Sequence, residues 1–267
     1  MTAVATLRVD FRRAVSLALP LDLEGAQPRH FGAPRASSTP LVVGSFNGEV
    51  SKGASCNCRG VTLVPHCNGT HTESVSHLTV DGVPLFSHVP LEPLPALVLS
   101  VVPRDAALTG EDSLPLPQAG DRLVTRQSVE AAWPRNLPFR ARTLVLRTLP
   151  HDTARPASDD GDDNPPYLTR QLVALLVERG VEHLVLDLPS VDRSDDGGHL
   201  TAHRLFFGLP VGSTTSAEAT RGHCTITELA AVPADVPDGP CAVQLQLARW
   251  TGDAVPSQPL YLPLVTA

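Results

Sequence analysis

The sequence predicts a mixed α/β protein made of many short elements, with at least part of its sheet parallel. Short runs rich in valine and leucine have the composition of β-strands. One longer segment has leucines at helical spacing, ends at Gly180 and is followed by another strand-like run. The 26 prolines and 19 glycines are spread along the chain, which favours short elements joined by surface connections.

Six runs are predicted to be strands because branched apolar residues dominate them. They are Leu41–Val43, Val61–Val64, Ala96–Val102, Thr143–Leu149, His183–Leu188 and Ala242–Leu247. The main predicted helix covers Tyr167–Arg179, where four leucines recur on one face. A helix followed by an apolar strand is typical of parallel pairing, and a second helix is expected in part of Ala202–Phe207.

The composition is that of a globular protein. Of 267 residues, 42% are hydrophobic and 18% charged, and we expect a single domain covering residues 1–267. The net charge of -7, without a clustered basic face, argues against a nucleic-acid partner. No apolar run approaches the roughly 20 residues that span a bilayer, so no membrane partner is expected.

The N-terminal segment and the cysteines both favour a cytoplasmic location. Arg12 and Arg13 precede an apolar stretch, but Pro20 interrupts it and no small-x-small cleavage site follows. This stretch is therefore interpreted as a first strand. The 5 cysteines are an odd number in a long chain, which does not indicate a disulfide framework.

Two long connections, Pro150–Pro166 and Val211–Gly222, are predicted to be loops. The first contains a run of aspartates but lacks the glycine and glutamate offsets of a calcium loop, so it is interpreted as a solvated acidic loop. Long loops in compact domains often border functional sites, and both are candidates for the rim of one.

The segment from Cys67 to His77 is the strongest functional signal. It contains His71 and Glu73, and His66 stands directly before it. Imidazole and carboxylate are the ligands expected for zinc or manganese. On an extended strand, the odd-numbered residues of this segment would share one face and His66 would point to the other. From composition alone, a metal or catalytic site and a set of hydrogen-bonded histidines in a polar strand both remain open.

This segment resembles the signature of the cyclase family, H-x-G-T-H-x-D-x-P-x-H, whose members include bacterial kynurenine formamidase (arylformamidase) and isatin hydrolase. Identity and spacing match at Gly69, Thr70, His71 and His77. Three positions differ, because Glu73 replaces the Asp, Val75 the Pro and Cys67 the first His. This chain is therefore similar to a divergent member of the family.

Later segments resemble the family in the same order along the chain. They are Gly180-Val181, Leu186–Asp192, Ala202–Leu205 and Ile226–Leu229. The resemblance implies a swivelling β/β/α fold with one largely parallel sheet, one mostly antiparallel sheet and few helices.

The resemblance also implies a two-metal site. The ligand positions fall on His71, Glu73, His203 and Glu228, with Cys67 or His66 in the first ligand position. His77 takes the position of the catalytic acid–base.

Neighbouring histidines and aspartates complete the candidate set. His199 is a rival of His203 as a ligand, and His223, close to Glu228 in the sequence, is a further candidate ligand. Asp187 and Asp192 are expected to support the site rather than to bind metal. Asp192 follows a predicted strand, where a carboxylate can orient a ligating imidazole.

The implied activity is hydrolysis of the carbon–nitrogen bond of a linear or cyclic amide by metal-activated water, with His77 as general acid and base. One or two zinc ions are expected, with manganese as the alternative, together with a small-molecule amide substrate and a homodimer or homotetramer. Two alternatives stay open. One is a divergent member without catalysis, and the other is an enzyme with Cys67 as nucleophile beside His71 or His66.

Overall fold

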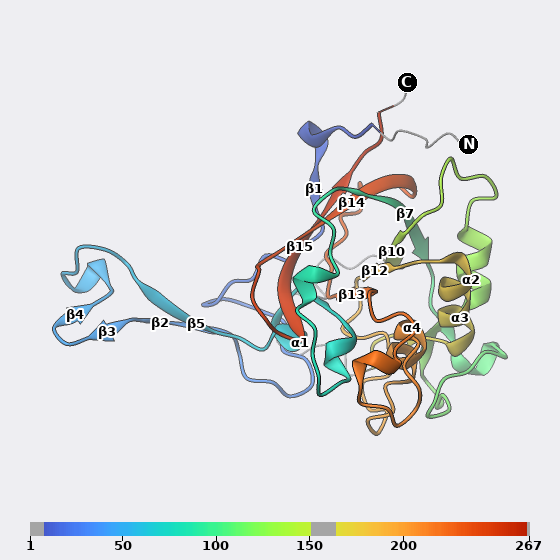
Figure 1. The fold of residues 1–267 in the computed structure, drawn as a ribbon, viewed down its shortest axis with the longest axis horizontal. Helices are drawn as coiled ribbons and strands as arrows, with labels where there is room; N and C mark the ends of the chain where they lie inside the picture. The colour runs from blue at the N-terminus through green and yellow to red at the C-terminus, as the bar shows by residue number, and fades with distance from the viewer. Residues whose placement is uncertain (1–7, 151–163, 266–267) are drawn as a thin grey trace.

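The computed structural model describes residues 8–150 and 164–265, drawn in Figure 1. The aspartates of the predicted acidic loop, Asp159, Asp160, Asp162 and Asp163, lie outside the described residues. Within the described part, no helix is long and apolar enough to cross a membrane.

The central 8-stranded sheet closes into a barrel because β15 pairs with both β14 and β6. In order around the barrel, the strands are β15 (Ala254–Leu262), β14 (Gly239–Leu247), β7 (Leu94–Val101), β10 (Thr143–Thr148), β12 (His183–Leu186), β13 (Thr225–Glu228) and β6 (His71–Glu73). The remaining strand, β1 (Val15–Ser16), pairs with β15 outside the ring and confirms the predicted first strand.

Strands β7, β10, β12 and β13 are parallel, as the predicted helix–strand unit indicated. The buried apolar residues form two clusters, one on each face of these strands. Leu97, Leu144 and Leu184 belong to the cluster under the helices, whereas Val145 and Val185 belong to the cluster on the opposite face. Burial on both faces explains why β7, β10 and β12 are largely apolar runs in the sequence.

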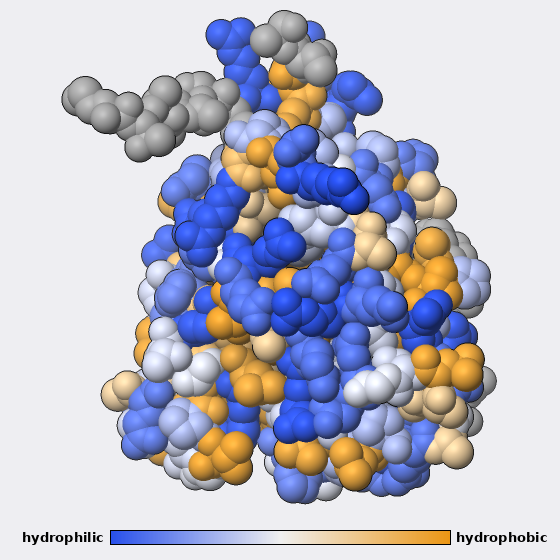
Figure 2. All heavy atoms as spheres, turned by 90° about the vertical axis from the view of Figure 1, so that its right-hand side faces the viewer, coloured by the Kyte–Doolittle hydropathy of each residue, from blue (hydrophilic) through white to orange (hydrophobic). Residues whose placement is uncertain are grey.

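Helices α2 (Arg126–Ala132) and α3 (Arg170–Arg179) cover the outside of the parallel strands (Figure 1). The helix was predicted to begin at Tyr167, but β11 (Tyr167–Leu168) pairs with β9 (Arg122–Val124), and α3 begins after Thr169. The Thr169 hydroxyl accepts a hydrogen bond from the Leu172 amide and caps the helix. Figure 2 shows that the outer face on this side is mostly hydrophilic, as expected of a solvated helix layer.

The antiparallel part of the barrel consists of β13, β6, β15, β14 and β7. The expected parallel and antiparallel parts are both present, and they join edge to edge in one closed sheet. Strand β15 closes the barrel because its first residues, Ala254–Pro256, pair with β6 while the strand also pairs with β14. Near its end, Leu260 and Tyr261 pair with β1.

A two-stranded arm projects away from the barrel (Figure 1). It consists of β2 (Ser37–Pro40) paired with β5 (Arg59–Thr62), and β3 (Val42–Val43) paired with β4 (Phe46–Asn47). Val42 is 65% exposed, so two of the predicted strand runs belong to this arm rather than to the core. Further short elements include α1 (Pro65–Asn68), β8 (Arg104–Asp105), which pairs with β9, and α4 (Thr201–Phe207).

Candidate metal centre

A cluster of histidine and carboxylate side chains lies where β6, β13, α1, α4 and the turn before β15 meet. Its possible ligand atoms form three overlapping groups, and within each group they lie within 4.8 Å of one another. The groups are His66–His71–Glu73, Glu73–His77–His203 and His66–His77–Asp253. Glu73, His66 and His77 each belong to two groups, so the cluster is one continuous site.

Strand β6 carries His71 and Glu73 on the same face, both fully buried. His71 stands opposite Glu228 of β13, and Glu73 stands opposite Ala254 of β15. The His71 Nδ1 atom lies 3.0 Å from the Gly69 carbonyl oxygen, so a proton on Nδ1 donates to that oxygen and Nε2 faces Glu228 Oε2 at 3.5 Å. Pairing on both edges of β6 therefore fixes the two side chains.

The Gly69-Thr70 pair of the signature has a structural role next to β6. The Thr70 hydroxyl donates to the Leu229 carbonyl and accepts from the Leu19 amide at 2.8 Å. Leu229 has a φ of 53° and directly follows Glu228. Thr70 therefore links β6 to the strained turn that ends β13.

His203 of α4 enters the site with its ring held by Asp192. The Asp192 carboxylate lies 2.7 Å from His203 Nδ1 and also accepts from the Ala202 amide at the start of the helix. His203 Nε2 then lies 2.8 Å from Glu73 Oε1. A metal-ligating histidine usually has a carboxylate on its other ring nitrogen. Asp192 makes this contact with His203, as expected of a residue that orients a ligating imidazole.

The other histidines considered as ligands, His199 and His223, belong to none of the three groups in the part of the chain that the structure describes. His199 and His223 are both exposed, whereas His203 is buried.

Glu228 lies close to the cluster, with Oε2 near His71 and Oε1 3.7 Å from His203 Nε2. The Val191 amide donates to Glu228 Oε1 at 2.9 Å and holds the carboxylate in place.

His66, not Cys67, faces Glu73. The expectation that His66 points away from the odd-numbered residues is wrong, because residues 65–68 form the helical turn α1 rather than a strand. His66 Nδ1 lies 3.1 Å from Glu73 Oε2. Cys67 belongs to none of the three groups formed by the described residues.

Cys67 is also poorly suited to act as a nucleophile. Burial, and then the charge of Glu228, raises the pKa of the Cys67 thiol. The thiolate is the nucleophilic form, so this environment disfavours it. The two histidines that could activate a thiol contact other groups. Both nitrogens of His66 contact carboxylates, those of Glu73 and Asp253, and His71 Nδ1 contacts the Gly69 carbonyl.

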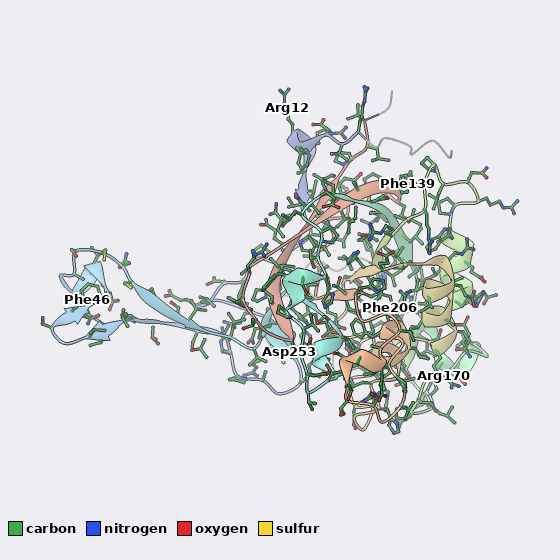
Figure 3. All side chains as sticks on the ribbon, viewed as in Figure 1. Arg12, Phe46, Phe139, Arg170, Phe206 and Asp253 are labelled. Atoms are coloured by element: carbon green, nitrogen blue, oxygen red, sulfur yellow. The ribbon has the colours of Figure 1, made fainter. Side chains whose placement is uncertain are left out.

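Asp253 joins the site without any signal in the sequence. It lies in the turn before β15, beside α1 in Figure 3, and its Oδ2 lies 2.8 Å from His66 Nε2. His77 Nδ1 lies 3.6 Å from the same oxygen, and the His77 ring centroid lies 4.2 Å from that of His66. A lone aspartate so far along the chain has no motif, so only the folded barrel reveals it.

The ionisable groups of the cluster shift one another's pKa values. Burial alone would raise the pKa of Glu73, but the nearby His203 and His77 hold it well below its usual range. Burial likewise opposes protonation of His203, but Glu73 and Asp192 raise its pKa well above the usual value. For His66, the charge contact with Glu73 and the hydrogen bond to Asp253 outweigh burial and raise the pKa to about 9.

The inward-facing atoms of the cluster fit a cation. His71 Nε2, His203 Nε2 and both carboxylate oxygens of Glu73 are buried and have no hydrogen-bond partner among the described residues. The short His203–Glu73 distance is a charge contact whose geometry is not that of a hydrogen bond. Buried polar atoms are almost always satisfied, and a divalent cation accepts these donor types.

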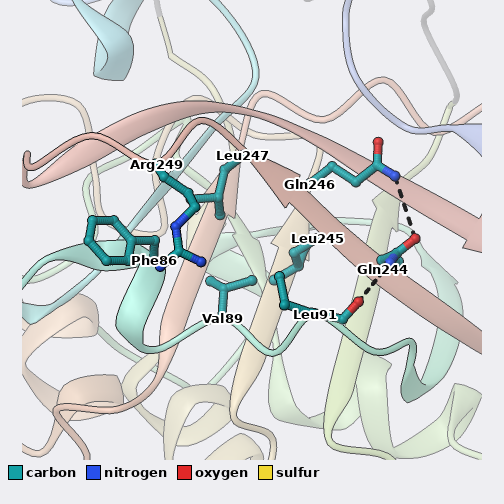
Figure 4. Close-up of a pocket in the computed structure, with 8 residues that line it drawn as sticks. All are labelled: Phe86, Val89, Leu91, Gln244, Leu245, Gln246, Leu247 and Arg249. Atoms are coloured by element: carbon teal, nitrogen blue, oxygen red, sulfur yellow. Dashed lines mark hydrogen bonds between the residues drawn. The ribbon is translucent and has the colours of Figure 1, made fainter.

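A pocket of about 290 Å³ borders the cluster at Asp253. The residues that line it are Ser76, Gly82, Val83, Pro84, Thr251, Gly252 and Asp253. Another pocket, drawn in Figure 4, lies between Phe86, Leu91 and β14, and none of its lining residues belongs to the cluster. The small pocket at Asp253 is therefore the better candidate for a substrate site.

Comparisons with known proteins agree with the fold. Solved structures with similar folds include a protein described as a potential metal-dependent hydrolase with cyclase activity (TM-score 0.61, 14% identity, covering 95% of this chain and 99% of that one). They also include a predicted metal-dependent hydrolase from Bacillus stearothermophilus (0.59, 15%, 94% and 98%) and isatin hydrolase A from Labrenzia aggregata bound to benzyl benzoate (0.60, 14%, 95% and 94%).

No curated protein sequence matches this chain. The model of the Cyclase family matches residues 15–193, which is more than half of the chain and includes His66, Glu73, His77 and Asp192. His203, Glu228 and Asp253 lie beyond the matched segment, and the fold brings them to it. The chain therefore belongs to the Cyclase family.

Proposed function

We propose that this chain is a metal-dependent hydrolase that cleaves the carbon–nitrogen bond of a linear or cyclic amide with water. The observation that carries the proposal is the buried Glu73 carboxylate, which faces His66 and His203 while neither of its oxygens has a hydrogen-bond partner among the described residues. The similarity in fold to isatin hydrolase and to other proteins described as metal-dependent hydrolases supports the same activity.

The ligands of the proposed site are nitrogen and oxygen atoms only. They come from His66, His71, Glu73, His203 and Glu228. Such a set suits one or two zinc ions, and manganese is the alternative. When bound, a divalent cation lowers the pKa of a water molecule and polarises a carbonyl oxygen.

His77 is the proposed proton carrier. Its side chain is 26% exposed, and its ring centroid lies 5.5 Å from that of His203. His77 therefore stands between the buried ligands and solvent, where an imidazole can give a proton to a departing nitrogen. The Asp253 carboxylate lies 3.6 Å from the His77 Nδ1 atom.

The proposed substrate is a small amide. The pocket at Asp253 is lined mainly by small side chains and backbone, and it is of the size that holds a small molecule. Phe206 and Phe207 are buried in the core and cannot line it. Trp250, which is 46% exposed and packs beside Gly252, is the aromatic side chain available at its edge.

The test is elemental analysis of the purified protein before and after incubation with Zn²⁺ or Mn²⁺, followed by hydrolysis assays on formamides and cyclic amides, including isatin. We expect bound metal, and turnover that a chelator abolishes and added metal restores. His71→Ala should lose both metal and turnover. His199→Ala, the same change at an exposed histidine, should keep both.

Three outcomes would contradict the proposal. Absence of metal binding by the purified, metal-incubated protein would exclude the mechanism. Loss of turnover in Cys67→Ser with metal content unchanged would instead support a cysteine nucleophile. Metal binding without turnover on any amide would support the alternative of a family member without catalysis.

A further inference from the structure

Asp253 contacts the cluster from a position that the family signature does not include. Its carboxylate lies 2.8 Å from His66 Nε2, on the side of the imidazole ring away from Glu73. The opposite ring nitrogen, Nδ1, lies 3.1 Å from Glu73 Oε2. His66 is thus held between two carboxylates, one buried and one 54% exposed.

The same arrangement occurs at His203 with the ring nitrogens exchanged. His203 presents Nε2 to Glu73 and Nδ1 to Asp192, whereas His66 presents Nδ1 to Glu73 and Nε2 to Asp253. A carboxylate that accepts the proton of one ring nitrogen leaves the lone pair of the other free for a metal ion. Asp253 therefore stands to His66 as Asp192 stands to His203.

We propose that Asp253 is a positioning residue that holds His66 as the first ligand of the metal site. This inference rests on the proposed function. His66 stands one residue before the position where the family signature has its first histidine, on a single helical turn, and its side chain is 19% exposed. Packing alone does not enclose the ring, so a hydrogen bond is needed to fix its orientation.

The backbone of Asp253 is fastened to the strand that carries Glu73. The Asp253 carbonyl accepts a hydrogen bond from the Ser74 amide at 3.3 Å, and the next residue, Ala254, pairs directly with Glu73. Asp253 and Glu73 therefore move together as parts of one sheet. Their two carboxylates set the position of the His66 ring, although α1 itself lies outside the sheet.

The alternative is that Asp253 binds metal itself with His66 and His77, since these three side chains also form one of the groups. The two roles predict different results. A positioning residue changes the affinity of the site for metal but not the number of ions bound. A ligand of a separate ion changes the number of ions.

The test is titration of the metal-free chain with Zn²⁺ by calorimetry, and with Co²⁺ by visible absorption. Asp253→Ala should weaken binding by roughly 10- to 100-fold with an unchanged number of ions, as is typical of the loss of such a support. Asp253→Asn keeps an acceptor oxygen and should lose less. In a His66→Ala background, Asp253→Ala should have no further effect on affinity.

The matched control is Asp235→Ala, which removes an exposed carboxylate outside the cluster and should leave affinity unchanged. An unchanged affinity of Asp253→Ala, an effect that adds to that of His66→Ala, or a lower number of ions would each overturn the inference. A wild-type chain that binds no metal would overturn the proposed function as well, so the two failures are distinguishable.

Discussion

Glu73 shows how one side chain determines the character of the site. It is longer by one methylene than the aspartate of the family signature, and its two oxygens lie at 2.8 Å from His203 and 3.1 Å from His66. The extra length lets the carboxylate contact both a histidine of α4 and one of α1. Glu73 thereby contacts His66, which stands one residue before Cys67.

Glu73→Gln is expected to destabilise the metal-free chain by about 3 kcal/mol, because it leaves the buried His203 facing a neutral amide. Urea unfolding in the presence of a chelator measures this loss. Glu178→Gln is the control, since Glu178 forms an exposed ion pair with Arg126, which is worth about 1 kcal/mol or less. Equal losses in the two variants would contradict the expectation.

At the scale of elements, the short helical turn α1 decides which residue faces the cluster. Pro65 begins the turn, and the chain then enters β6 after Gly69. Strand parity correctly placed His71 and Glu73 on one face because they lie within β6. It failed for His66 and Cys67 because a four-residue turn does not follow the two-residue repeat of a strand.

Strand β12 supplies a prediction about pH. Burial lowers the pKa of His183 to about 4, and its Nδ1 atom contacts the Thr225 hydroxyl of β13 at 2.9 Å. In the unfolded chain the histidine binds a proton with its ordinary pKa of about 6.5, so stability is lost as the pH falls from about 6.5 toward 4. From pH 7 to pH 5, this histidine should cost about 2 kcal/mol of unfolding free energy.

His183→Asn removes the titration while keeping a polar atom near Thr225. Urea unfolding of both chains at pH 7 and pH 5 measures the difference. The stability lost between these two pH values should be smaller in the variant by about 2 kcal/mol. An identical loss in both chains would show that His183 does not titrate in this range.

At the scale of the whole molecule, the arm formed by residues 37–62 is the main departure from a closed barrel (Figure 1). Val42, Val43 and Val61 are 65%, 61% and 54% exposed. Exposed apolar side chains that gather on one feature often mark a contact with another chain. The homodimer or homotetramer expected from the family resemblance stays a prediction, and this arm is the surface to test.

Replacing Val42 and Val43 by lysine should change the stability of the barrel by no more than about 0.5 kcal/mol, since both side chains are exposed. If the arm joins copies of the chain, the variant should sediment as a smaller species than the wild type. Analytical ultracentrifugation measures this. An unchanged sedimentation coefficient would exclude these residues from the contact.

The sequence by itself determined the local features of this protein. The apolar runs became the parallel strands β7, β10 and β12, because strands buried on both faces must be apolar throughout. The spacing of His71, Glu73 and His77 marked the cluster, because these residues belong to one short segment.

Only the tertiary structure brings residues from far along the chain to the cluster, and it alone reveals Asp253 among them. The pairing of β6 with both β13 and β15 closes the barrel and brings Glu228 and Asp253 beside His71 and Glu73. The tertiary structure also shows that His66, rather than Cys67, faces Glu73. Such choices depend on which strands become neighbours, and long-range pairing leaves no periodic signal in the sequence around a single aspartate.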